Sequence, residues 1–498
     1  MKLTKFAFAM AIALTGCNSS TEHLKSLNPD NFDKDIPVGD DFYGHVNHIW
    51  QQTHPLSDEY ARYGNFNVLA DTAEVRVRDL VLGLDATNPE PGSVAHKVST
   101  IYEQGMDSVR RNAEGAQPIL ADLRKIEETP HDGMEELFYW MQANYSNPFV
   151  SAGPMEDLSN SNAYAMYIEP GAMTLGDRDY YLDDSERNVT VREAYKTLVN
   201  TQMQNAGYTP EEAARITANV MKIETAMAEK AWTREENRRI ELMNNPRSMA
   251  ELQQMYPAVN WERFFPATME INDVDTVIVT QIEPIQRGVE LLGSLSDREI
   301  KDFYLWLYVR QAAPYLSDNF ADASFEFSKV MRGVKEQRPR WKRALGTTES
   351  LLGEAIGELY VEKYFPESSK EYMVGLVENL RTALGEHIDN LTWMSDSTKA
   401  NAREKLAAFT VKIGYPDKWK DYSSMTIDPA LSYYENTHNA SMWHQKEQLA
   451  KWGKPVDKTE WGMTPQTVNA YYNPMANEIV FPAAILQAPF FDPEASDA

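Results

Sequence analysis

The stretch NAYYNPMANEIVFPAAILQAPFF, at residues 469–491, stands near the end of a chain of 498 residues. Residues 468–472 and 478–481 are rich in types that favour β-strands, and residues 473–477 between them carry the Asn and Pro of a turn. Two short β-rich segments across such a turn predict a β-hairpin. Since roughly thirty residues, far fewer than a domain, follow the change of pattern, the hairpin predicts the beginning of a β-containing unit.

The chain before the hairpin has helical periodicity. Thr209 and Glu212 form a capping box with Pro210 at the first helical position, and apolar residues follow at helical spacing. The same spacing recurs at residues 373–391, and a polar, Pro-rich loop at residues 85–92 separates two helical segments. The sequence therefore predicts a mainly α fold with a large multi-helix lobe.

The composition is that of a large acidic globular protein. The chain has 74 acidic and 48 basic side chains, a formal net charge of −26 and 43% apolar residues. A nucleic-acid-binding protein would show a basic face, so we expect no nucleic-acid partner. The mean hydropathy is −0.51, and no apolar run approaches the roughly 20 residues of a bilayer span, which excludes a membrane-embedded body.

The N-terminus has the pattern of a bacterial lipoprotein signal. Lys2 and Lys5 precede an unbroken apolar run at residues 6–14, which is typical of a signal peptide. Residues 14–17 are Leu-Thr-Gly-Cys and resemble a lipobox, whose cysteine becomes the lipidated first residue. Cys17 is the only cysteine, so one acylated thiol accounts for it. The alternative is an ordinary cleaved signal peptide with an unrelated cysteine.

These features predict where the protein is located. We expect residues 1–16 to be a signal peptide and residues 17–41, which are polar and aperiodic, to be a tether. Lipidation at Cys17, followed by Asn18, predicts an anchor in the bacterial cell envelope, at the outer membrane facing the periplasm. Membrane contact is expected through the lipidated Cys17 only.

The hairpin sequence resembles a segment of the neprilysin / endothelin-converting-enzyme family of zinc metalloendopeptidases. Other stretches resemble family signatures in family order, so that the resemblance covers residues 40–498. These stretches are residues 41–43 with Asn47 and Trp50, residues 62–66, 176–181, 339–341, 393–394, 398–399 and 414–416, and residues 456–457 with Trp461. The single cysteine and the lipobox resemble the bacterial lipoprotein branch rather than the disulfide-bonded, membrane-spanning animal enzymes.

The resemblance implies a division of the chain. Residues 42–66 would form an N-terminal segment packing toward the catalytic lobe, and residues 67–430 would form the α-helical lobe. Residues 431–498 would begin a thermolysin-like zincin catalytic lobe and carry its substrate-binding edge strand. The resemblance also implies zinc as the cofactor, and peptides as the substrates, of the complete enzyme.

Three residues match substrate-binding positions of the family. The resemblance implies that Asn469 and Ala470 lie on an edge strand and hold a peptide in extended form, a mode in which main-chain hydrogen bonds give the affinity. It also implies that Arg62 binds the C-terminal carboxylate of a substrate, a task suited to a guanidinium. The family's second arginine falls at Ala70, which weakens carboxylate recognition. Without the resemblance, Asn469 would be expected to cap a turn and Arg62 to form a surface ion pair.

The sequence lacks the zinc motif of a zincin. Such a site needs His-Glu-x-x-His on one helix and a third ligand further on. None of the nine histidines forms this motif: they are at positions 23, 45, 48, 54, 96, 131, 387, 438 and 444. No Gly-x-Ser-x-Gly elbow is present, and the one cysteine is in the lipobox. We therefore expect no catalytic residue and no bound zinc in this chain.

The resemblance continues through residues 490–493, and the chain ends at Ala498. The sequence therefore predicts a truncated catalytic lobe, in a chain that is the N-terminal portion of a cell-envelope zinc metalloendopeptidase and is inactive alone. The alternative is a non-enzymatic peptide-binding or interaction lipoprotein of the envelope.

Overall fold

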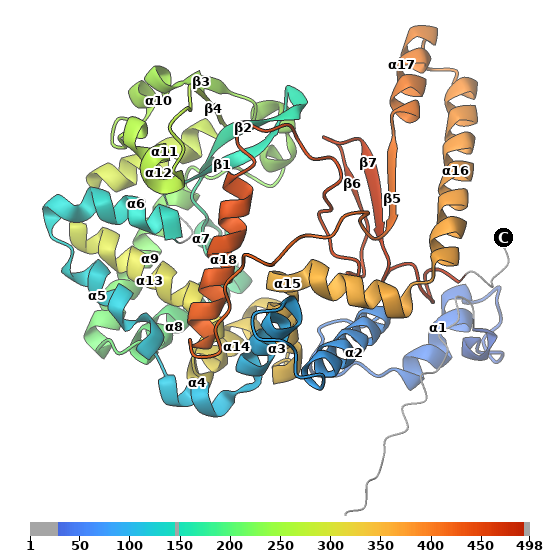
Figure 1. The fold of residues 1–498 in the computed structure, drawn as a ribbon, viewed down its shortest axis with the longest axis horizontal. Helices are drawn as coiled ribbons and strands as arrows, with labels where there is room; N and C mark the ends of the chain where they lie inside the picture. Colours follow the sequence, from blue (N-terminus) through green and yellow to red (C-terminus); the bar gives the residue numbers. More distant parts are fainter. Residues whose placement is uncertain (1–27, 145–148, 493–498) are drawn as a thin grey trace, which may run out of the picture. The chain divides into compact units, whose positions relative to one another are not determined.

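The computed structural model describes residues 28–144 and 149–492 of the chain (Figure 1). These residues belong to two compact units. Residues 28–54 and 486–492 form one unit, and residues 55–144 and 149–485 form the other.

The unit boundaries differ from the predicted domain division. The boundary after His54 divides the segment 42–66, and the boundary before Leu486 divides the segment 431–498. These boundaries depend on contacts between residues that lie far apart in the sequence, so the sequence pattern did not predict them. The predicted signal peptide and the lipidation site Cys17 lie outside the described residues.

The first unit contains a short 3-10 helix, η1 (Pro29–Asn31), and the helix α1 (Phe42–Thr53). A hydrogen bond joins the two segments, because Nδ1 of His48 lies 2.5 Å from Oδ2 of Asp33. This hydrogen bond holds the pKa of the Asp33 carboxyl below its ordinary value. Residues 28–41, which the sequence assigns to the tether, are therefore tied to α1 by a polar contact.

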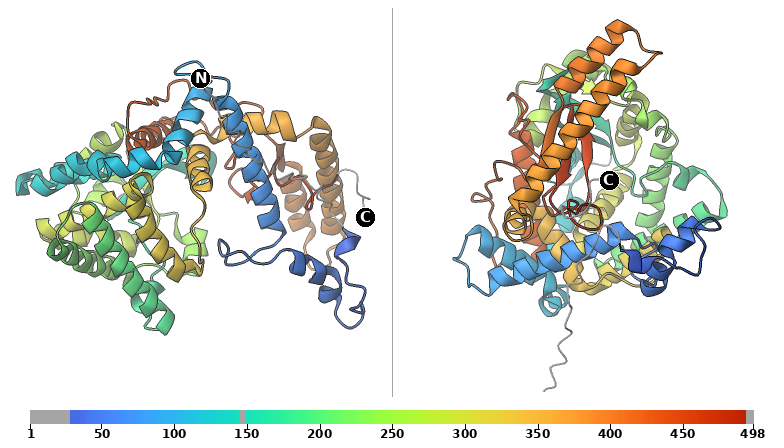
Figure 2. Two further views of the ribbon diagram at one scale, coloured as in Figure 1. Left: turned by 90° about the horizontal axis from the view of Figure 1, so that it is seen from below. Right: turned by 90° about the vertical axis from the view of Figure 1, so that its right-hand side faces the viewer.

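The second unit is mainly helical, which confirms the predicted fold class, and Figure 2 shows its helices from two further directions. Its α-helices are α2 (Asn65–Asp85), α3 (Val94–Met106), α4 (Ser108–Glu114), α5 (Leu120–Glu128), α6 (Met134–Asn144), α7 (Asp179–Leu182), α8 (Glu186–Asn205), α9 (Pro210–Ala228), α10 (Met249–Met255), α11 (Trp261–Met269), α12 (Ile282–Ser294), α13 (Asp297–Ala312), α14 (Asp318–Arg332), α15 (Arg340–Tyr364), α16 (Glu367–Asn390), α17 (Asp396–Ala407) and α18 (Tyr433–Leu449).

Shorter elements connect and flank these helices. The strands are β1 (Val150–Asp157), β2 (Asn160–Pro170), β3 (Pro246–Ser248), β4 (Thr276–Val279), β5 (Thr410–Gly414), β6 (Tyr471–Asn473) and β7 (Glu478–Pro482). The 3-10 helices are η2 (Gln117–Ile119), η3 (His131–Gly133), η4 (Glu236–Arg238), η5 (Ile240–Leu242) and η6 (Ala313–Tyr315).

Local sequence sets the starts of several helices. At α9 the predicted capping box is confirmed: the main-chain N–H of Glu212 donates to Thr209 Oγ1 at 3.2 Å, and that of Thr209 donates to Glu212 Oε2 at 2.9 Å. The same reciprocal Ser–Glu pair begins α10, α13 and α18. Each pair satisfies two main-chain donors that a helix start leaves unpaired.

An extensive core of the second unit lies around α13, which packs on α5, α8 and α9. The Trp306 side chain of α13 is fully buried, and its Nε1–H donates to the hydroxyl of Tyr195 on α8 at 2.9 Å. A buried indole N–H needs such a partner, so the pair fixes the two helices in one packing arrangement.

The predicted α-helical lobe also contains a four-stranded sheet, of order β1-β2-β4-β3. Strands β1 and β2 form an antiparallel pair, and β2 pairs with β4 in parallel. Trp261, Phe264 and Phe265 of α11 are buried in the core that covers this sheet. The sequence did not predict the sheet, because β4 has only four residues and its partner β2 is over a hundred residues away.

A second sheet, of order β5-β7-β6, contains the predicted hairpin. Strands β6 and β7 pair antiparallel with Tyr472 opposite Ile479, which confirms the hairpin at residues 468–481. Strand β7 lies in the middle of the sheet, since it also pairs with β5 in parallel. Figure 1 shows this sheet beside α16 and α17, and α16 contacts β5.

Helix α18 begins after residue 430, where the sequence places the start of the catalytic lobe. It packs on α3 and α15 of the predicted helical lobe and also contacts β1. Residues on both sides of the predicted boundary thus belong to one packed body within residues 55–485.

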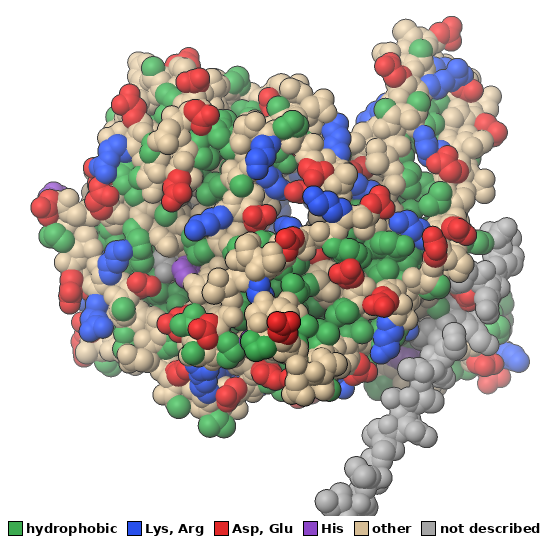
Figure 3. All heavy atoms as spheres, viewed as in Figure 1, with side chains coloured by type: hydrophobic (Ala, Val, Ile, Leu, Met, Phe, Trp, Pro, Cys, Tyr) green, Lys and Arg blue, Asp and Glu red, His purple; other side chains and the backbone are tan. Residues whose placement is uncertain are grey.

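The visible surface reflects the composition. Figure 3 shows acidic side chains spread over the face in view, with basic side chains between them. Among residues 28–144 and 149–492, no helix is both long and apolar enough to cross a membrane.

Candidate functional site

Strand β6 lies at one edge of its sheet, and two of the predicted substrate-binding residues directly precede it. Asn469 is exposed and Ala470 is half-buried. The side-chain oxygen of Asn469 accepts a hydrogen bond from the main-chain N–H of Ala470 at 2.9 Å. The structure therefore brings the two residues together at the start of the edge strand, rather than inside it.

The segment that leads into β6 is packed on α15. A Cβ atom on Gly353 would lie 2.7 Å from Thr464, and one on Gly357 would lie 2.7 Å from Pro465. These two glycines therefore allow an approach that any side chain would block. Their role as a docking surface becomes visible only in the structure.

Helix α15 is also kinked at this point, because Leu352 has non-helical backbone angles. Two side chains form hydrogen bonds with main-chain carbonyl oxygens around the kink. Nε2 of Gln466 donates to the carbonyl of Gly353 at 3.0 Å, and Nε2 of His444 lies 2.8 Å from the carbonyl oxygen of Leu351. Gln466 is three residues before Asn469, so the kink and its partners help to fix the position of the candidate site.

Glu349, one turn before the kink, is a titratable group that the sequence did not single out. Burial raises the pKa of its carboxyl to about 7, against a hydrogen bond from Gln466 that lowers it, and the nearby Glu74 raises it further. The Glu349 carboxyl thus combines a raised pKa with a hydrogen bond to Gln466, three residues before Asn469.

A buried ion pair crosses the same sheet. Lys412 on β5 and Glu478 on β7 are both at most 10% exposed, and Nζ to Oε2 is 2.7 Å. Lys412 also donates to the carbonyl of Glu460 at 2.8 Å. This pair joins the central strand to its parallel neighbour and to the loop before β6.

Arg62 lies in the exposed loop before α2. Its side chain forms no hydrogen bond or ion pair with the described residues, so the predicted alternative of a surface ion pair is not what the structure shows. No hydrogen bond or ion pair within the described part of the chain joins Arg62 to Asn469 or Ala470. Ala70, at the family's second arginine position, lies in α2 and is half-buried.

The loop that carries Arg62 is held on both sides of this residue. Nζ of Lys342, on α15, lies 2.9 Å from Glu59 and 3.0 Å from Asp71. The hydroxyl of Tyr60 donates to Asp71 as well. The sequence offered no sign of this cluster, because Lys342 lies more than 260 residues from the residues it contacts.

Two further contacts and the local pKa values show how tightly the cluster is paired. Nζ of Lys342 is 3.5 Å from Glu74, and the hydroxyl of Tyr63 donates to Asp71 at 3.0 Å. Burial and the Asp71 carboxylate raise the pKa of Tyr63 to about 12. Burial lowers the pKa of Lys342, but its hydrogen bonds to Glu59 and Asp71 outweigh burial and raise it above the ordinary value.

The described residues do not fit a zinc site. No group of three or more His, Cys, Asp or Glu side chains among residues 28–144 and 149–492 is placed to hold a metal ion. His438 and His444 on α18 are in part buried, and burial lowers the pKa of both. No step of a reaction is therefore assigned to zinc on these residues.

Comparison with known proteins identifies the class to which this fold and edge strand belong. Residues 38–416 match the model of the N-terminal part of peptidase family M13, and residues 469–498 match a second model of peptidase family M13. The chain belongs to peptidase family M13. The second match contains Asn469 and Ala470, and the membership confirms the resemblance seen in the sequence.

Individual relatives agree with this assignment. The chain is 29% identical over 490 residues to endothelin-converting enzyme 1 of Rattus norvegicus, covering 94% of this chain and 63% of the relative. It is 27% identical over 502 residues to neprilysin-3 of Drosophila melanogaster, covering 95% of this chain and 63% of the relative. The chain thus spans less than two thirds of the length of these relatives.

Solved structures show the same fold. The zinc metalloprotease Zmp1 of Mycobacterium tuberculosis, in complex with an inhibitor, superposes with a TM-score of 0.87 at 32% identity, covering 95% of this chain and 72% of that chain. PepO from Lactobacillus rhamnosis shares the fold with a TM-score of 0.83 at 20% identity, covering 93% of this chain and 73% of that chain.

Proposed function

We propose that this chain forms the peptide-holding portion of a zinc metallopeptidase and that a peptide binds in extended form along β6. The observation that carries this proposal is the position of β6 at the edge of the sheet β5-β7-β6, with Asn469 and Ala470 at its start. An edge strand presents main-chain donors and acceptors to a further strand, so it binds peptides largely regardless of their side chains.

Asn469 supplies the polar contact beside the ladder. Its side-chain oxygen already accepts from Ala470, which leaves the amide nitrogen as a donor toward a peptide carbonyl. Arg62 supplies a guanidinium for the C-terminal carboxylate of the peptide. Because Ala70 replaces the second arginine, a single cation is available, and we expect only a modest preference for peptides with a free C-terminal carboxylate.

Peptide hydrolysis is proposed for the zinc-loaded enzyme and not for the 498-residue chain on its own. A zinc site of this class supplies an activated water and polarises the scissile carbonyl. None of the nine histidines of the chain belongs to a His-Glu-x-x-His motif. We therefore propose that the chain binds peptides and does not cut them, with or without added zinc.

Calorimetric titration with an unlabelled pentapeptide tests the binding proposal. Asn469→Ala removes the side-chain contact and is expected to weaken binding about tenfold, which is the loss of one well-placed hydrogen bond. Asn401→Ala, at an exposed asparagine of α17, is the matched control and should bind like the wild type. Equal affinities for the two variants would contradict the assignment of Asn469.

A fluorogenic peptide tests the absence of hydrolysis. We expect no increase in fluorescence with added zinc, and no effect of a chelator. Zinc-dependent cleavage that a chelator abolishes would contradict the proposal that this chain binds without cutting.

We also propose a cell-envelope location, with a lipid anchor on Cys17. Support comes from the charged, apolar and Leu-Thr-Gly-Cys segments at residues 2–17, which lie outside the described residues. Metabolic labelling with a fatty acid in a bacterial host should label the wild type and not Cys17→Ser. Labelling of both, or of neither, would contradict the anchor.

A further inference from the structure

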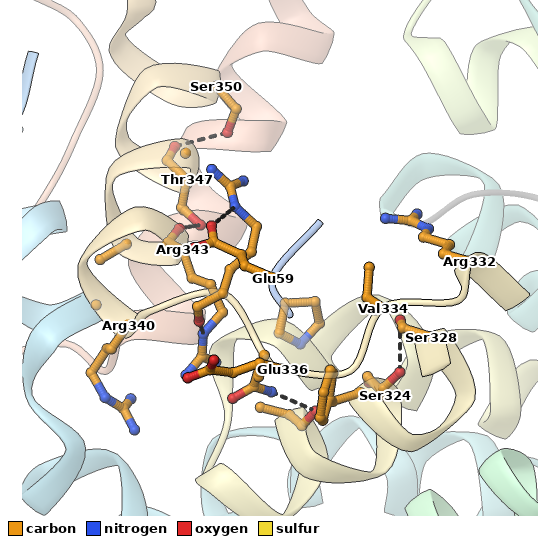
Figure 4. Close-up of a pocket in the computed structure, with 18 of the residues that line it drawn as sticks. Glu59, Ser324, Ser328, Arg332, Val334, Glu336, Arg340, Arg343, Thr347 and Ser350 are labelled. Atoms are coloured by element: carbon orange, nitrogen blue, oxygen red, sulfur yellow. Dashed lines mark hydrogen bonds and ion pairs between the residues drawn. The ribbon is translucent and has the colours of Figure 1, made fainter. Parts of the chain in front are cut away.

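A cavity of about 670 Å³ lies between α14 and α15 and the loop that joins them (Figure 4). Figure 4 shows Ser324 and Ser328 of α14 on one side, and Thr347 and Ser350 of α15 on the other. Neither Arg62 nor Asn469 lines it. We call this space the arginine cavity, after its five arginines: Arg111, Arg332, Arg338, Arg340 and Arg343.

The charge of the arginine cavity is opposite to that of the chain. Five arginines and only two carboxylates, Glu59 and Glu336, line it, whereas the whole chain has a formal net charge of −26. Cations gathered in a partly enclosed space strengthen the local positive potential. A cluster of five arginines in so acidic a chain indicates a local site that favours an anion.

Two of the five arginines are already neutralised. Arg338 pairs with Glu74, and its Nε lies 3.7 Å from Glu59. Arg340 pairs with Asp318. The charges of these two guanidiniums are therefore used within the fold, although Nη1 of Arg340 is buried and has no hydrogen-bond partner in the described part of the chain.

Arg111 has no carboxylate partner. Its guanidinium is buried and donates to the main-chain carbonyl of Leu316 at 2.6 Å and to that of Pro314 at 2.8 Å. It also lies 5.0 Å from the centre of the Tyr433 ring. These partners are main-chain carbonyls and an aromatic ring, so no carboxylate is bonded to Arg111 directly.

Arg343 and Arg332 are the cations with donors to spare. Nε of Arg343 donates to the carbonyl of Arg338 at 3.2 Å, and the guanidinium forms no ion pair with a described carboxylate. The side chain of Arg332 makes no hydrogen bond or ion pair with the residues that the structure describes. Burial lowers the pKa of Arg343, and the neighbouring Arg340 lowers it further, whereas the carboxylates of Asp318 and Asp322 raise it.

The remaining walls of the arginine cavity are largely apolar. Phe325 of α14, Val334 of the connecting loop, and Ala344 of α15 line it together with the ring of Tyr433. A cavity of a few hundred Å³ with apolar walls and a few convergent polar groups is typical of sites for small organic ligands.

We propose that the arginine cavity binds an organic carboxylate with an apolar body. The carboxylate accepts hydrogen bonds from Arg343, because a guanidinium presents paired N–H donors that match its two oxygens. Arg332, on the α14 side of the cavity, adds positive charge (Figure 4). The apolar body lies against Phe325, Val334 and Tyr433. This site includes neither Arg62 nor Asn469, although Glu59 and Tyr60, from the loop that carries Arg62, line it.

Titration calorimetry with N-acetylphenylalanine tests the proposal on the full chain. We expect binding of N-acetylphenylalanine, and at least tenfold weaker binding of its uncharged amide and of inorganic phosphate. Arg343→Gln should weaken binding at least tenfold, and Arg332→Gln, which removes a positive charge from the opposite side of the cavity, should weaken it by a smaller factor. Arg332 is exposed, so its replacement tests the site even where Arg343→Gln perturbs folding. Arg239→Gln, at an exposed arginine that pairs with Glu241, is the matched control and should leave binding unchanged.

The remaining outcomes would overturn the proposal. Equal affinity for the amide would show that the carboxylate is not recognised, and equal affinity for phosphate would show that the apolar walls have no role. Wild-type binding by Arg332→Gln and by a folded Arg343→Gln would remove the arginines from the site. Loss of binding in Arg62→Gln, with both cavity variants unaffected, would place the carboxylate at the peptide-binding edge instead.

Discussion

Replacing Lys342 by Met tests how the loop that carries Arg62 is held. The Lys342 side chain is 10% exposed, and its ammonium lies within 3.5 Å of Glu59, Asp71 and Glu74. Methionine keeps most of the volume but removes the cation that three carboxylates share; Glu59 and Glu74 keep Arg338 nearby, whereas Asp71 loses its ion pair. Breaking a buried ion pair by removing one partner costs about 3–5 kcal/mol, so we expect a loss of that size in the free energy of unfolding.

Lys335 provides the matched control for this experiment. Its Nζ lies 3.1 Å from Asp58 of the same loop, but the two side chains are 78% and 59% exposed. An exposed ion pair contributes about 0–1 kcal/mol, so Lys335→Met should be close to the wild type. The comparison of the two variants shows whether the loss of stability depends on the burial and the number of partners of the lysine, or only on the presence of an ion pair.

Urea unfolding and limited trypsin digestion measure the two consequences. Lys342→Met should unfold at lower urea concentration, and trypsin should cut after Arg62 faster than in the wild type, because the released loop opens more often. Equal urea midpoints for the Lys342 and Lys335 variants would refute the assignment of the cluster. Unchanged cleavage after Arg62 would refute its role in holding the loop.

Three further predictions concern α15 and α9. The pKa of Glu349 is raised from 4.5 to about 7 in the folded chain, so the free energy of unfolding should fall by about 3 kcal/mol as pH rises from about 4.5 to 7. Glu349→Gln should remove this pH dependence in urea midpoints measured from pH 4.5 to 8. Gly357→Ala places a methyl group 2.7 Å from Pro465, so it should lower the free energy of unfolding by about 1–3 kcal/mol and weaken peptide binding. Gly346→Ala, on the same helix but facing open space, should change neither quantity in urea unfolding and calorimetric titration. Thr209→Ala removes the cap of α9 and should cost about 1 kcal/mol by urea unfolding; an unchanged midpoint would show that the cap is redundant.

Features set by neighbouring residues were predictable from the sequence. The hairpin at residues 468–481 and the capping box of α9 each depend on residues a few positions apart, and the structure confirms both. The parallel pairing of β5 with β7 was not predictable, because it joins strands more than sixty residues apart without a local signal. The sheet of β1 to β4 escaped prediction for the same reason.

The candidate site likewise has residues that the sequence predicted and residues that it did not. Asn469, Ala470 and Arg62 were predicted through the resemblance to the family, which supplies what spacing alone does not. The sequence did not predict three features: the Lys342 cluster, the raised pKa of Glu349 and the arginine cavity. Each depends on side chains that are distant in the sequence and meet only in the folded chain. Isolated Lys, Glu and Arg residues on helices have no pattern that distinguishes a buried partner from a solvated one.

Backbone amide exchange at residues 470–473, measured with and without a saturating extended peptide, tests the central claim most directly. If the peptide pairs with β6, amide exchange in these residues should slow, while exchange in β3, the edge strand at Pro246–Ser248 in the other sheet, should stay unchanged. Unchanged exchange at residues 470–473 with the peptide bound, or equal slowing in β3, would contradict the claim that β6 holds the substrate.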